Sequence, residues 1–331
     1  MRALVTGAGG FLGRHVVAVL RARKVTVRAL LRPTARLEAL GWSDEVEVFR
    51  GDLRASQDLE HAFEDVDVLV HLAAAVSGGE DAQFASTVVG TERLLEAMVH
   101  TGCRRVVLAS SFSVYDWSAI EGVLDEDSPL EPVPALYQRD GYSIAKSWQE
   151  RLVREACAAH GWDLTVLRPG FIWGRDHADL AALGLKVGPV RVVIAPLARM
   201  PMTHVENCAD LFALATVDPR ARGETFNVVD GHGERIWDFT GEYQRRTGER
   251  SARIPVPYRL AHSVVSLAFE SVFRRNPKLP QILIPCRLES RLKPLRYTGR
   301  RARERLGWTP PLDLATCLRR TFEPLAPGPE A

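Results

Sequence analysis

Short apolar runs alternate with amphipathic segments along the first half of the chain. Strands are predicted over residues 2–6, 25–31, 47–49, 66–72 and 105–110, and helices over residues 15–23, 83–100 and 147–160. Continuous apolar runs of this length are typical of strands that are buried on both faces of a parallel sheet. Strands that alternate with helices predict an α/β protein built on a doubly wound parallel sheet.

The turn after the first strand is rich in glycine and reads Thr6-Gly-Ala-Gly-Gly-Phe-Leu-Gly13. Gly7, Gly10 and Gly13 are three residues apart, which allows a tight turn and a close approach of the backbone to a pyrophosphate. The helix that follows offers free N–H groups and the positive end of its dipole to phosphates. The spacing differs from the general GxGxxG pattern, but its place between strand and helix predicts a dinucleotide site. The alternative is a tight turn without a ligand.

The end of the second strand indicates which dinucleotide binds. A carboxylate there would bond the ribose 2′-hydroxyl of NAD, whereas an arginine suits the 2′-phosphate of NADP. Arg32 occupies this position, so the sequence favours NADP over NAD. The alternative is a solvated arginine with NAD bound less selectively. Asp52, after the third strand, is a candidate acceptor for the adenine amino group or else a helix N-cap.

Tyr142 and Lys146 are four residues apart at the start of a predicted helix, so their side chains lie one above the other. A neighbouring ammonium lowers the pKa of a phenol from its usual value of roughly 10. Such a phenol can give a proton to a ketone oxygen or take one from an alcohol. The alternative is a chance pair, because tyrosine and lysine at this spacing also occur by accident.

Composition narrows the class of protein further. The 331 residues are 46% hydrophobic and 25% charged, with a net charge of +2, as in a globular protein that acts on a small molecule and not on nucleic acid. The five cysteines are scattered and form no CxxC pair, which indicates reduced thiols, a cytoplasmic setting and no structural metal. No apolar run reaches 18 residues, so no integral membrane segment is expected.

Six motifs follow one another along the chain: Thr6-Gly-Ala-Gly-Gly-Phe-Leu-Gly13, Gly51-Asp52-Leu53, His71-Leu-Ala-Ala74, Ser110-Ser-Phe-Ser-Val-Tyr115, Tyr142-Ser-Ile-Ala-Lys146 and Leu167-Arg-Pro-Gly170. With them the chain resembles the extended short-chain dehydrogenase/reductases, the NAD(P)-dependent epimerase/dehydratase group. The resemblance implies a Rossmann domain over residues 1–170, to which residues 204–231 return. It also implies a smaller substrate domain from residues 171–203 and 232–331. Family members are commonly homodimers, here through residues 83–100 and 147–160.

The resemblance also implies roles for individual residues. Tyr142 is the expected catalytic acid/base, Lys146 tunes it and holds the nicotinamide ribose, and Ser111 hydrogen-bonds the reacting oxygen. Besides Tyr142 and Lys146, the expected cofactor contacts are Gly7, Gly10, Phe11, Leu12, Gly13, Arg32, Asp52, Leu53, Leu72, Ala73, Ala74, Pro169 and Gly170. His71 is expected to pack beside the cofactor.

The resulting hypothesis is an NAD(P)-dependent oxidoreductase that transfers hydride between nicotinamide and a secondary alcohol or ketone. A sugar-nucleotide epimerase or dehydratase is the alternative within the enzymes, and a non-catalytic NADP-binding regulatory protein is the alternative outside them. Two departures from the family pattern matter. Thr87 stands where the family often has asparagine, and Phe171-Ile-Trp173 replaces an asparagine and tyrosine of sugar-nucleotide members. The second departure makes the site more apolar.

The sequence of the C-terminal part contains fewer recognisable motifs. The apolar segment 258–273 is expected to pack against the sheet domain, although it could also cover a substrate or touch a membrane. The loop 175–182 is expected to carry solvated charges and no metal. The arginine-rich stretch 287–305 is interpreted as a solvated helix face, with one or two arginines as possible ligands of a substrate diphosphate.

Overall fold

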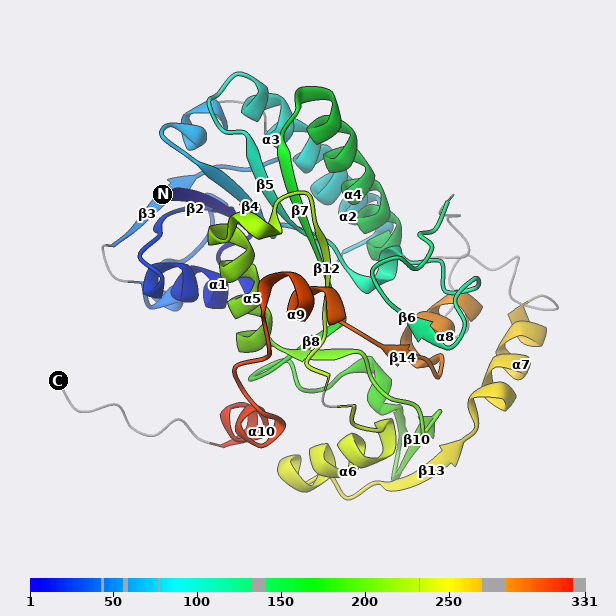
Figure 1. Cartoon of the computed structure of the whole chain (residues 1–331). Coiled ribbons are helices and arrows are strands. Elements are labelled where there is room, and N and C mark those ends of the chain that lie inside the picture. Colours follow the sequence, from blue (N-terminus) through cyan, green and yellow to red (C-terminus); the bar gives the residue numbers. More distant parts are fainter. Residues whose placement is uncertain are drawn as a thin grey trace, which may run out of the picture.

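A parallel sheet of seven strands forms the centre of the protein (Figure 1). The computed structural model describes residues 1–42, 45–55, 59–76, 78–132, 141–231, 233–269 and 284–323. The strand order is β12-β7-β5-β4-β1-β2-β3, and every neighbouring pair is parallel. The strands are β1 (Arg2–Thr6), β2 (Thr26–Leu31), β3 (Val46–Arg50), β4 (Val68–His71), β5 (Arg105–Ala109), β7 (Asp163–Pro169) and β12 (Thr225–Val228). The predicted doubly wound parallel sheet is confirmed.

Helices cover both faces of this sheet (Figure 1). One face forms a core with α1 (Phe11–Ala22), α5 (Val205–Val217) and α9 (Arg300–Leu306), and the other forms a core with α3 (Gly90–Val99) and α4 (Gly141–His160). In α1 the buried residues Val16, Val17 and Leu20 recur at helical spacing. The inner strands β1, β4 and β5 are mostly apolar because both of their faces are buried.

The direction of strand addition changes between β1 and β4. From β1 the chain adds β2 and β3 on one side, and from β4 it adds β5, β7 and β12 on the other. Ligands of open α/β sheets bind at the carboxyl ends of strands at such a switch point. Thr6 and His71 are the last residues of the two strands that meet there.

The helix predicted over residues 83–100 is not continuous. α2 (Glu80–Phe84) passes into a π-helical turn, η3 (Ala85–Val89), before α3 begins. Thr87 lies buried in this turn, and its Oγ1 accepts a hydrogen bond from Ala75 N at 3.0 Å. Turns of this kind frequently mark functional sites, and this one packs beside the switch point.

A second lobe lies below the sheet in Figure 1 and has its own hydrophobic core. It contains a three-stranded sheet, a two-stranded sheet and four helices: β9 (Leu185–Val187), β10 (Val190–Ile194), β13 (Ala252–Val256), β8 (Phe171–Trp173), β11 (Met202–His204), α6 (Ile236–Thr247), α7 (Tyr258–Ala268), α8 (Pro285–Leu292) and α10 (Leu314–Phe322). The short strands β6 (Val123–Leu124) and β14 (Arg296–Tyr297) pair with each other. The division into two domains remains a prediction, and Ala302, Leu306 and Trp308 lie in the core of the sheet half.

The expected burial of segment 258–273 against the sheet domain is wrong for its described part. Only Ala261 and Val265 of α7 are buried, and they join the core of the second lobe. Leu260, Val264 and Leu267 are exposed by 58%, 58% and 70%. Residues 270–273 lie outside the described residues. The apolar periodicity predicted a helix correctly, but periodicity alone does not say which neighbour the helix packs against.

None of the helices in the described part of the chain combines the length and the apolar content that crossing a bilayer requires.

Candidate active site

Tyr142 and Lys146 lie on the first two turns of α4, at the carboxyl edge of the sheet. Only glycine fits at position 141, because a Cβ there would lie 2.9 Å from Glu80 Cα of α2. This close contact fixes where α4 begins. Lys146 is 3% exposed, whereas Tyr142 is half-buried. The helical spacing predicted for the pair is thus present in the structure.

Ser111 reaches Tyr142 from the end of β5. It is the N-cap of a short 3₁₀ turn, η4 (Phe112–Val114), and its Oγ accepts a hydrogen bond from Ser113 N at 3.2 Å. The same side chain is hydrogen-bonded to the Tyr142 hydroxyl. The structure therefore brings together Ser111 and Tyr142 from segments 31 positions apart in sequence.

The pKa of Tyr142 differs in direction from the expectation. Burial raises this pKa, and the hydrogen bond with Ser111 lowers it by less. The predicted lowering by Lys146 does not appear, because the ammonium is engaged elsewhere. Lys146 Nζ donates to Ala109 O at 2.6 Å and to Gln149 Oε1 at 2.8 Å. Burial lowers the pKa of Lys146 to about 7, although the charge of Glu150 opposes this.

A buried polar network that sequence analysis missed lies beneath Lys146. Gln149 is 1% exposed and contacts Lys146, Ala73, Thr91 and His71. His71 is likewise 1% exposed, and its pKa is lowered to about 3 by burial and then by the charge of Lys146. No motif identified Gln149. Its spacing of three residues from Lys146 was the only available signal, because residues at that spacing share a helix face.

Glu150 and Arg168 form a buried ion pair next to this network, each 3% exposed at the side chain. Arg168 donates from Nη2 to Oε1 at 2.6 Å and from Nε to Oε2 at 3.1 Å. Burial alone would raise the pKa of Glu150, but the bonds from Arg168 outweigh it and lower this pKa to about 2. Ser110 donates to Glu150 Oε2 at 2.5 Å, so it anchors α4 to β5 and caps no backbone.

The glycine turn lies against the end of β4 and leaves no room for side chains. A Cβ on Gly7, whose φ is +68°, would lie 2.8 Å from Ala73 N, and one on Gly13 would lie 2.1 Å from Gly7 O. Gly10 is the N-cap of α1, and no side chain caps that helix. The first N–H groups of α1 therefore have no side-chain cap, and a helix N-terminus of this kind fits a pyrophosphate.

The other predicted cofactor residues border the same crevice. Leu72, Ala73 and Ala74 follow β4 and are partly exposed, while Pro169 ends β7 and Gly170 follows it. Phe11 stacks on His177 with ring centroids 4.0 Å apart. His177 belongs to the loop 175–182, which thus covers the start of α1.

Arg32 and Asp52 follow the neighbouring strands β2 and β3 at the carboxyl edge of the sheet. Arg32 is exposed directly after β2. The Asp52 carboxylate accepts hydrogen bonds from Arg54, which lower its pKa to about 2, with a small further lowering by the charge of Arg32. Leu53 packs against Gly90. A carboxylate is thus present near Arg32, but it is already paired with an arginine.

The loop 175–182 carries exposed carboxylates, as expected, whereas the arginine-rich stretch 287–305 includes a buried arginine. Within the described residues, no group of three or more histidine, cysteine, aspartate or glutamate side chains is placed to hold a metal ion. Asp176 and Asp179 lie 3.7 Å from Arg14 and 3.9 Å from Arg191. Arg287, expected on a solvated face, is buried; burial and then the charge of Arg291 lower its pKa to about 10.

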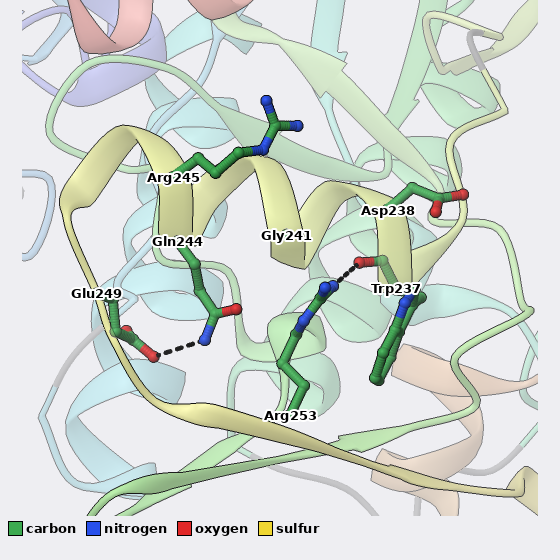
Figure 2. Close-up of a pocket in the computed structure, with 7 residues that line it drawn as sticks. All are labelled: Trp237, Asp238, Gly241, Gln244, Arg245, Glu249 and Arg253. Carbon is green, nitrogen blue, oxygen red and sulfur yellow. Dashed lines mark hydrogen bonds between the residues drawn. The ribbon is translucent and has the colours of Figure 1, made fainter.

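A separate hollow lies on the second lobe between α6 and β13 (Figure 2). The Arg253 guanidinium stacks on the Trp237 ring at 4.2 Å and donates to Trp237 O at 2.6 Å. Gln244 and Glu249 close its other end. None of the predicted site residues lines this hollow.

Comparison with known proteins identifies the class to which this site belongs. Residues 3–228 match the model of the NAD dependent epimerase/dehydratase family. A 3beta-hydroxysteroid-dehydrogenase/decarboxylase of Arabidopsis thaliana is 26% identical over 97% of this chain and 78% of its own length. A 4-hydroxy-2-methyl-3-oxo-4-farnesyl-3,4-dihydroquinoline-1-oxide ketoreductase of Stigmatella aurantiaca is 30% identical over 83% of this chain and 81% of its own.

Among solved structures, UDP-glucuronic acid 4-epimerase from Bacillus cereus in complex with NAD superposes with a TM-score of 0.73. The two chains are 19% identical and the superposition covers 98% of each, so this similarity supports the fold alone. The chain belongs to the NAD-dependent epimerase/dehydratase family, within the extended short-chain dehydrogenase/reductases. The resemblance inferred from the six motifs is confirmed, and the protein is an NAD-dependent enzyme of this family.

Proposed function

We propose that the protein is a dehydrogenase or reductase that moves hydride between nicotinamide and an apolar secondary alcohol or ketone. The hydrogen bond between Tyr142 and Ser111 at the carboxyl edge of the sheet is the observation that carries this proposal. When bound, the nicotinamide supplies or accepts the hydride. The glycine turn and the N-terminus of α1 would hold its pyrophosphate.

In this proposal the chain itself handles the proton and the oxygen. Tyr142 transfers the proton between its hydroxyl and the substrate oxygen. Ser111 donates a hydrogen bond to the same oxygen as charge develops on it. Lys146 stays beneath them, where its ammonium binds the nicotinamide ribose. The raised pKa of Tyr142 suits the role of acid in the free enzyme, because the phenol then holds its proton until substrate arrives.

An apolar substrate is supported by the residues beyond β7. Phe171 and Ile172 of β8 are partly exposed, and neither can hydrogen-bond a sugar hydroxyl. The two curated relatives described above are named for a hydroxysteroid and for a farnesylated dihydroquinoline oxide. Both names describe ring systems with large apolar surfaces. A steroid or a comparable polycyclic compound is therefore the substrate class that we propose.

NADP is the proposed form of the cofactor. Arg32 is exposed at the end of β2, where the ribose 2′-position is read, and the nearby Asp52 carboxylate is paired with Arg54. An arginine can bond a 2′-phosphate with two parallel hydrogen bonds.

The proposed function is tested by Tyr142→Phe, assayed with a 3β-hydroxysteroid and either NAD⁺ or NADP⁺ by the absorbance of the reduced nicotinamide. We expect turnover to fall by about 10²–10⁴-fold, the usual contribution of a positioned acid/base, while NADH and NADPH bind as before. Tyr243→Phe on α6 is the matched control and should keep full turnover. Wild-type turnover in Tyr142→Phe would overturn the assignment.

Epimerisation or dehydration of a sugar nucleotide is the second candidate. Arg287 is buried and Arg291 half-buried on α8, and buried arginines suit a diphosphate. This candidate predicts that UDP-glucose binds and is converted without net consumption of added cofactor. Oxidation of the steroid with release of reduced cofactor, and no conversion of UDP-glucose, would favour the first proposal.

We also propose a homodimer that forms through α4. In the other helical range expected at the dimer interface, residues 83–100, Leu94, Leu95 and Met98 are buried in the core of the chain itself. Trp148 is 43% exposed on α4 and stacks with Arg151 at 5.5 Å, so it is the better candidate. Sedimentation equilibrium of the wild type and of Trp148→Glu tests this: the variant should shift toward monomer.

A further inference from the structure

Gln149 lies one turn beyond Lys146 on α4 and faces the same buried space. Its Oε1 accepts from Lys146 Nζ at 2.8 Å, and its Nε2 donates to Ala73 O at 3.1 Å. An ammonium can only donate and a backbone carbonyl can only accept. The orientation of the Gln149 amide is therefore fixed by two partners of opposite kind, one on each end.

Two further groups hold the amide nitrogen. Nε2 lies 2.9 Å from Thr91 Oγ1 and 3.0 Å from His71 Nε2. The Thr91 hydroxyl gives its own proton to Thr87 O at 2.5 Å, so its oxygen is an acceptor for the amide. His71 Nε2 also lies 2.8 Å from Thr91 Oγ1, and the amide has only two N–H groups for Ala73 O, Thr91 Oγ1 and His71 Nε2. His71 Nε2 therefore either accepts from the amide or donates to Thr91 Oγ1, and Nδ1 meets Thr6 Oγ1 at 2.6 Å in both cases.

A neutral His71 ring satisfies either arrangement. The strongly lowered pKa of His71, which burial and the charge of Lys146 produce, agrees with this assignment. β4 thus meets Gln149 through a ring that carries no charge.

The contact with Gln149 limits which hydrogen bonds the Lys146 ammonium can still make. An ammonium has three N–H groups. Ala109 O and Gln149 Oε1 take two of them, and within the described residues no partner is found for the third. Two bonds from different elements, β5 and α4, fix the position of Nζ and leave one donor for a ligand.

We propose that Gln149 is a positioning residue: its amide oxygen fixes the Lys146 ammonium and helps to keep it charged, so that the third N–H is presented to the cofactor ribose. This inference rests on the proposed function, in which Lys146 binds the nicotinamide ribose. Other charged or titratable groups that face Lys146 are Glu150 and Tyr142 on its own helix and His71 on β4. Arg168 of β7 is paired with Glu150.

The pH dependence of cofactor binding provides a readout that does not need the substrate. Binding of NADH and NADPH is followed by nicotinamide fluorescence for the wild type, Gln149→Leu and Gln149→Glu across a range of pH. Affinity should fall with rising pH as Lys146 loses its proton. Leucine removes the acceptor that stabilises the ammonium, so the midpoint should move down by about one pH unit, and glutamate should move it up by about as much.

At pH values below the midpoint, Gln149→Leu should also bind NADPH about tenfold more weakly, the value of one hydrogen bond to a charged group. Gln244→Leu is the matched control. Gln244 is also a buried glutamine, and its Nε2 donates to Ser251 O at 2.9 Å, but it lies on α6 beside the hollow of Figure 2. Both leucine variants should melt at lower temperature, and only Gln149→Leu should move the midpoint.

The outcomes separate this inference from the function on which it rests. If the wild type binds neither NADH nor NADPH, the proposed function fails and the inference with it. If the wild type binds and all variants share its midpoint, only the positioning role of Gln149 is overturned. Should Gln149→Leu fail to fold, the comparison of Gln149→Glu with the wild type decides alone, because glutamate preserves the shape of the side chain.

Discussion

The half of the protein that contains the seven-stranded sheet (the sheet half) and the second lobe differ in which side chains they bury and which they expose. Around the start of α4 the sheet half buries charged and polar groups, among them Lys146, Gln149, Glu150 and His71, and each is hydrogen-bonded within the protein. On α7 of the second lobe, by contrast, apolar leucine and valine side chains are exposed to solvent. A buried polar group without a partner is costly, whereas an exposed apolar group costs little.

This difference indicates which half of the protein tolerates amino-acid substitution. In the sheet half each polar group depends on a partner from another element, so removal of one leaves another unsatisfied. In the second lobe the outward side chains of α7 have few such dependencies. The candidate site thus lies in an interior whose polar groups are paired, whereas the outward face of α7 carries side chains without such pairing.

The largest effect is expected when a partner is removed from the buried ion pair. Arg168→Met leaves the Glu150 carboxylate buried without its main donor, which should cost about 3–5 kcal/mol of unfolding free energy. Denaturant unfolding at neutral pH measures this. The double variant Glu150→Leu, Arg168→Met should be more stable than Arg168→Met alone. A loss below about 1 kcal/mol in the single variant would contradict the comparison.

Two leucines of the second lobe, one buried and one exposed, test whether burial determines the cost of a substitution. Leu288 on α8 is 1% exposed and Leu260 on α7 is 58% exposed. Leu288→Ala should cost about 2–5 kcal/mol, because it leaves a cavity in the core of the lobe. Leu260→Ala should stay within about 0.5 kcal/mol of the wild type. Equal losses in denaturant unfolding would show that the exposed face of α7 is covered in solution.

The fold could be predicted from sequence, and a candidate site located, because both depend on local signals. The glycine turn, the buried strands and the pair Tyr142–Lys146 each depend on a few neighbouring residues. The contact of Ser111 with Tyr142 depended on the resemblance, since residues of β5 and α4 meet only through the sheet. Gln149 was not found, because its partners come from β4, the residues that follow β4 and α3, and none is near it in sequence except Lys146.

The placement of α7 and the pKa of Tyr142 could not be predicted for a related reason. An apolar stripe predicts a helix without naming the surface it meets. A lysine one turn from a tyrosine lowers the pKa of the phenol only if its ammonium points there, and the Lys146 ammonium instead meets Ala109 O and Gln149. In both cases the result depends on tertiary neighbours.

A smaller effect is expected at the far edge of the sheet half, where a charged group is exposed. Arg32→Ser should reduce the preference for NADPH over NADH by about tenfold to a hundredfold, because one charge-assisted contact with the 2′-phosphate is lost. Fluorescence titration with both cofactors measures the ratio of dissociation constants. Arg259→Ser on α7 is the control and should leave the ratio unchanged. A ratio that does not respond to Arg32→Ser would assign NAD to this site.

The smallest effect concerns the acid sensitivity that a buried neutral imidazole introduces. The pKa of His71 is about 3 in the folded protein, below the value of about 6.5 expected in the unfolded chain. Between these values the unfolded chain binds a proton that the folded protein does not, so stability is complete above about pH 6.5 and falls as the pH drops. The slope due to this residue should approach about 1.4 kcal/mol per pH unit.

Denaturant unfolding of the wild type and of His71→Asn, at several pH values between about 7.5 and 5.5, isolates this contribution. The difference between the two proteins should shrink steadily as the pH falls, because only the wild type loses the contribution of His71. His15, whose pKa burial also lowers, is common to both and cancels. A constant difference would mean that His71 accepts a proton in place. The interior of the sheet half would then tolerate an added charge. Burial would no longer distinguish how the sheet half and the exposed face of α7 respond to a change.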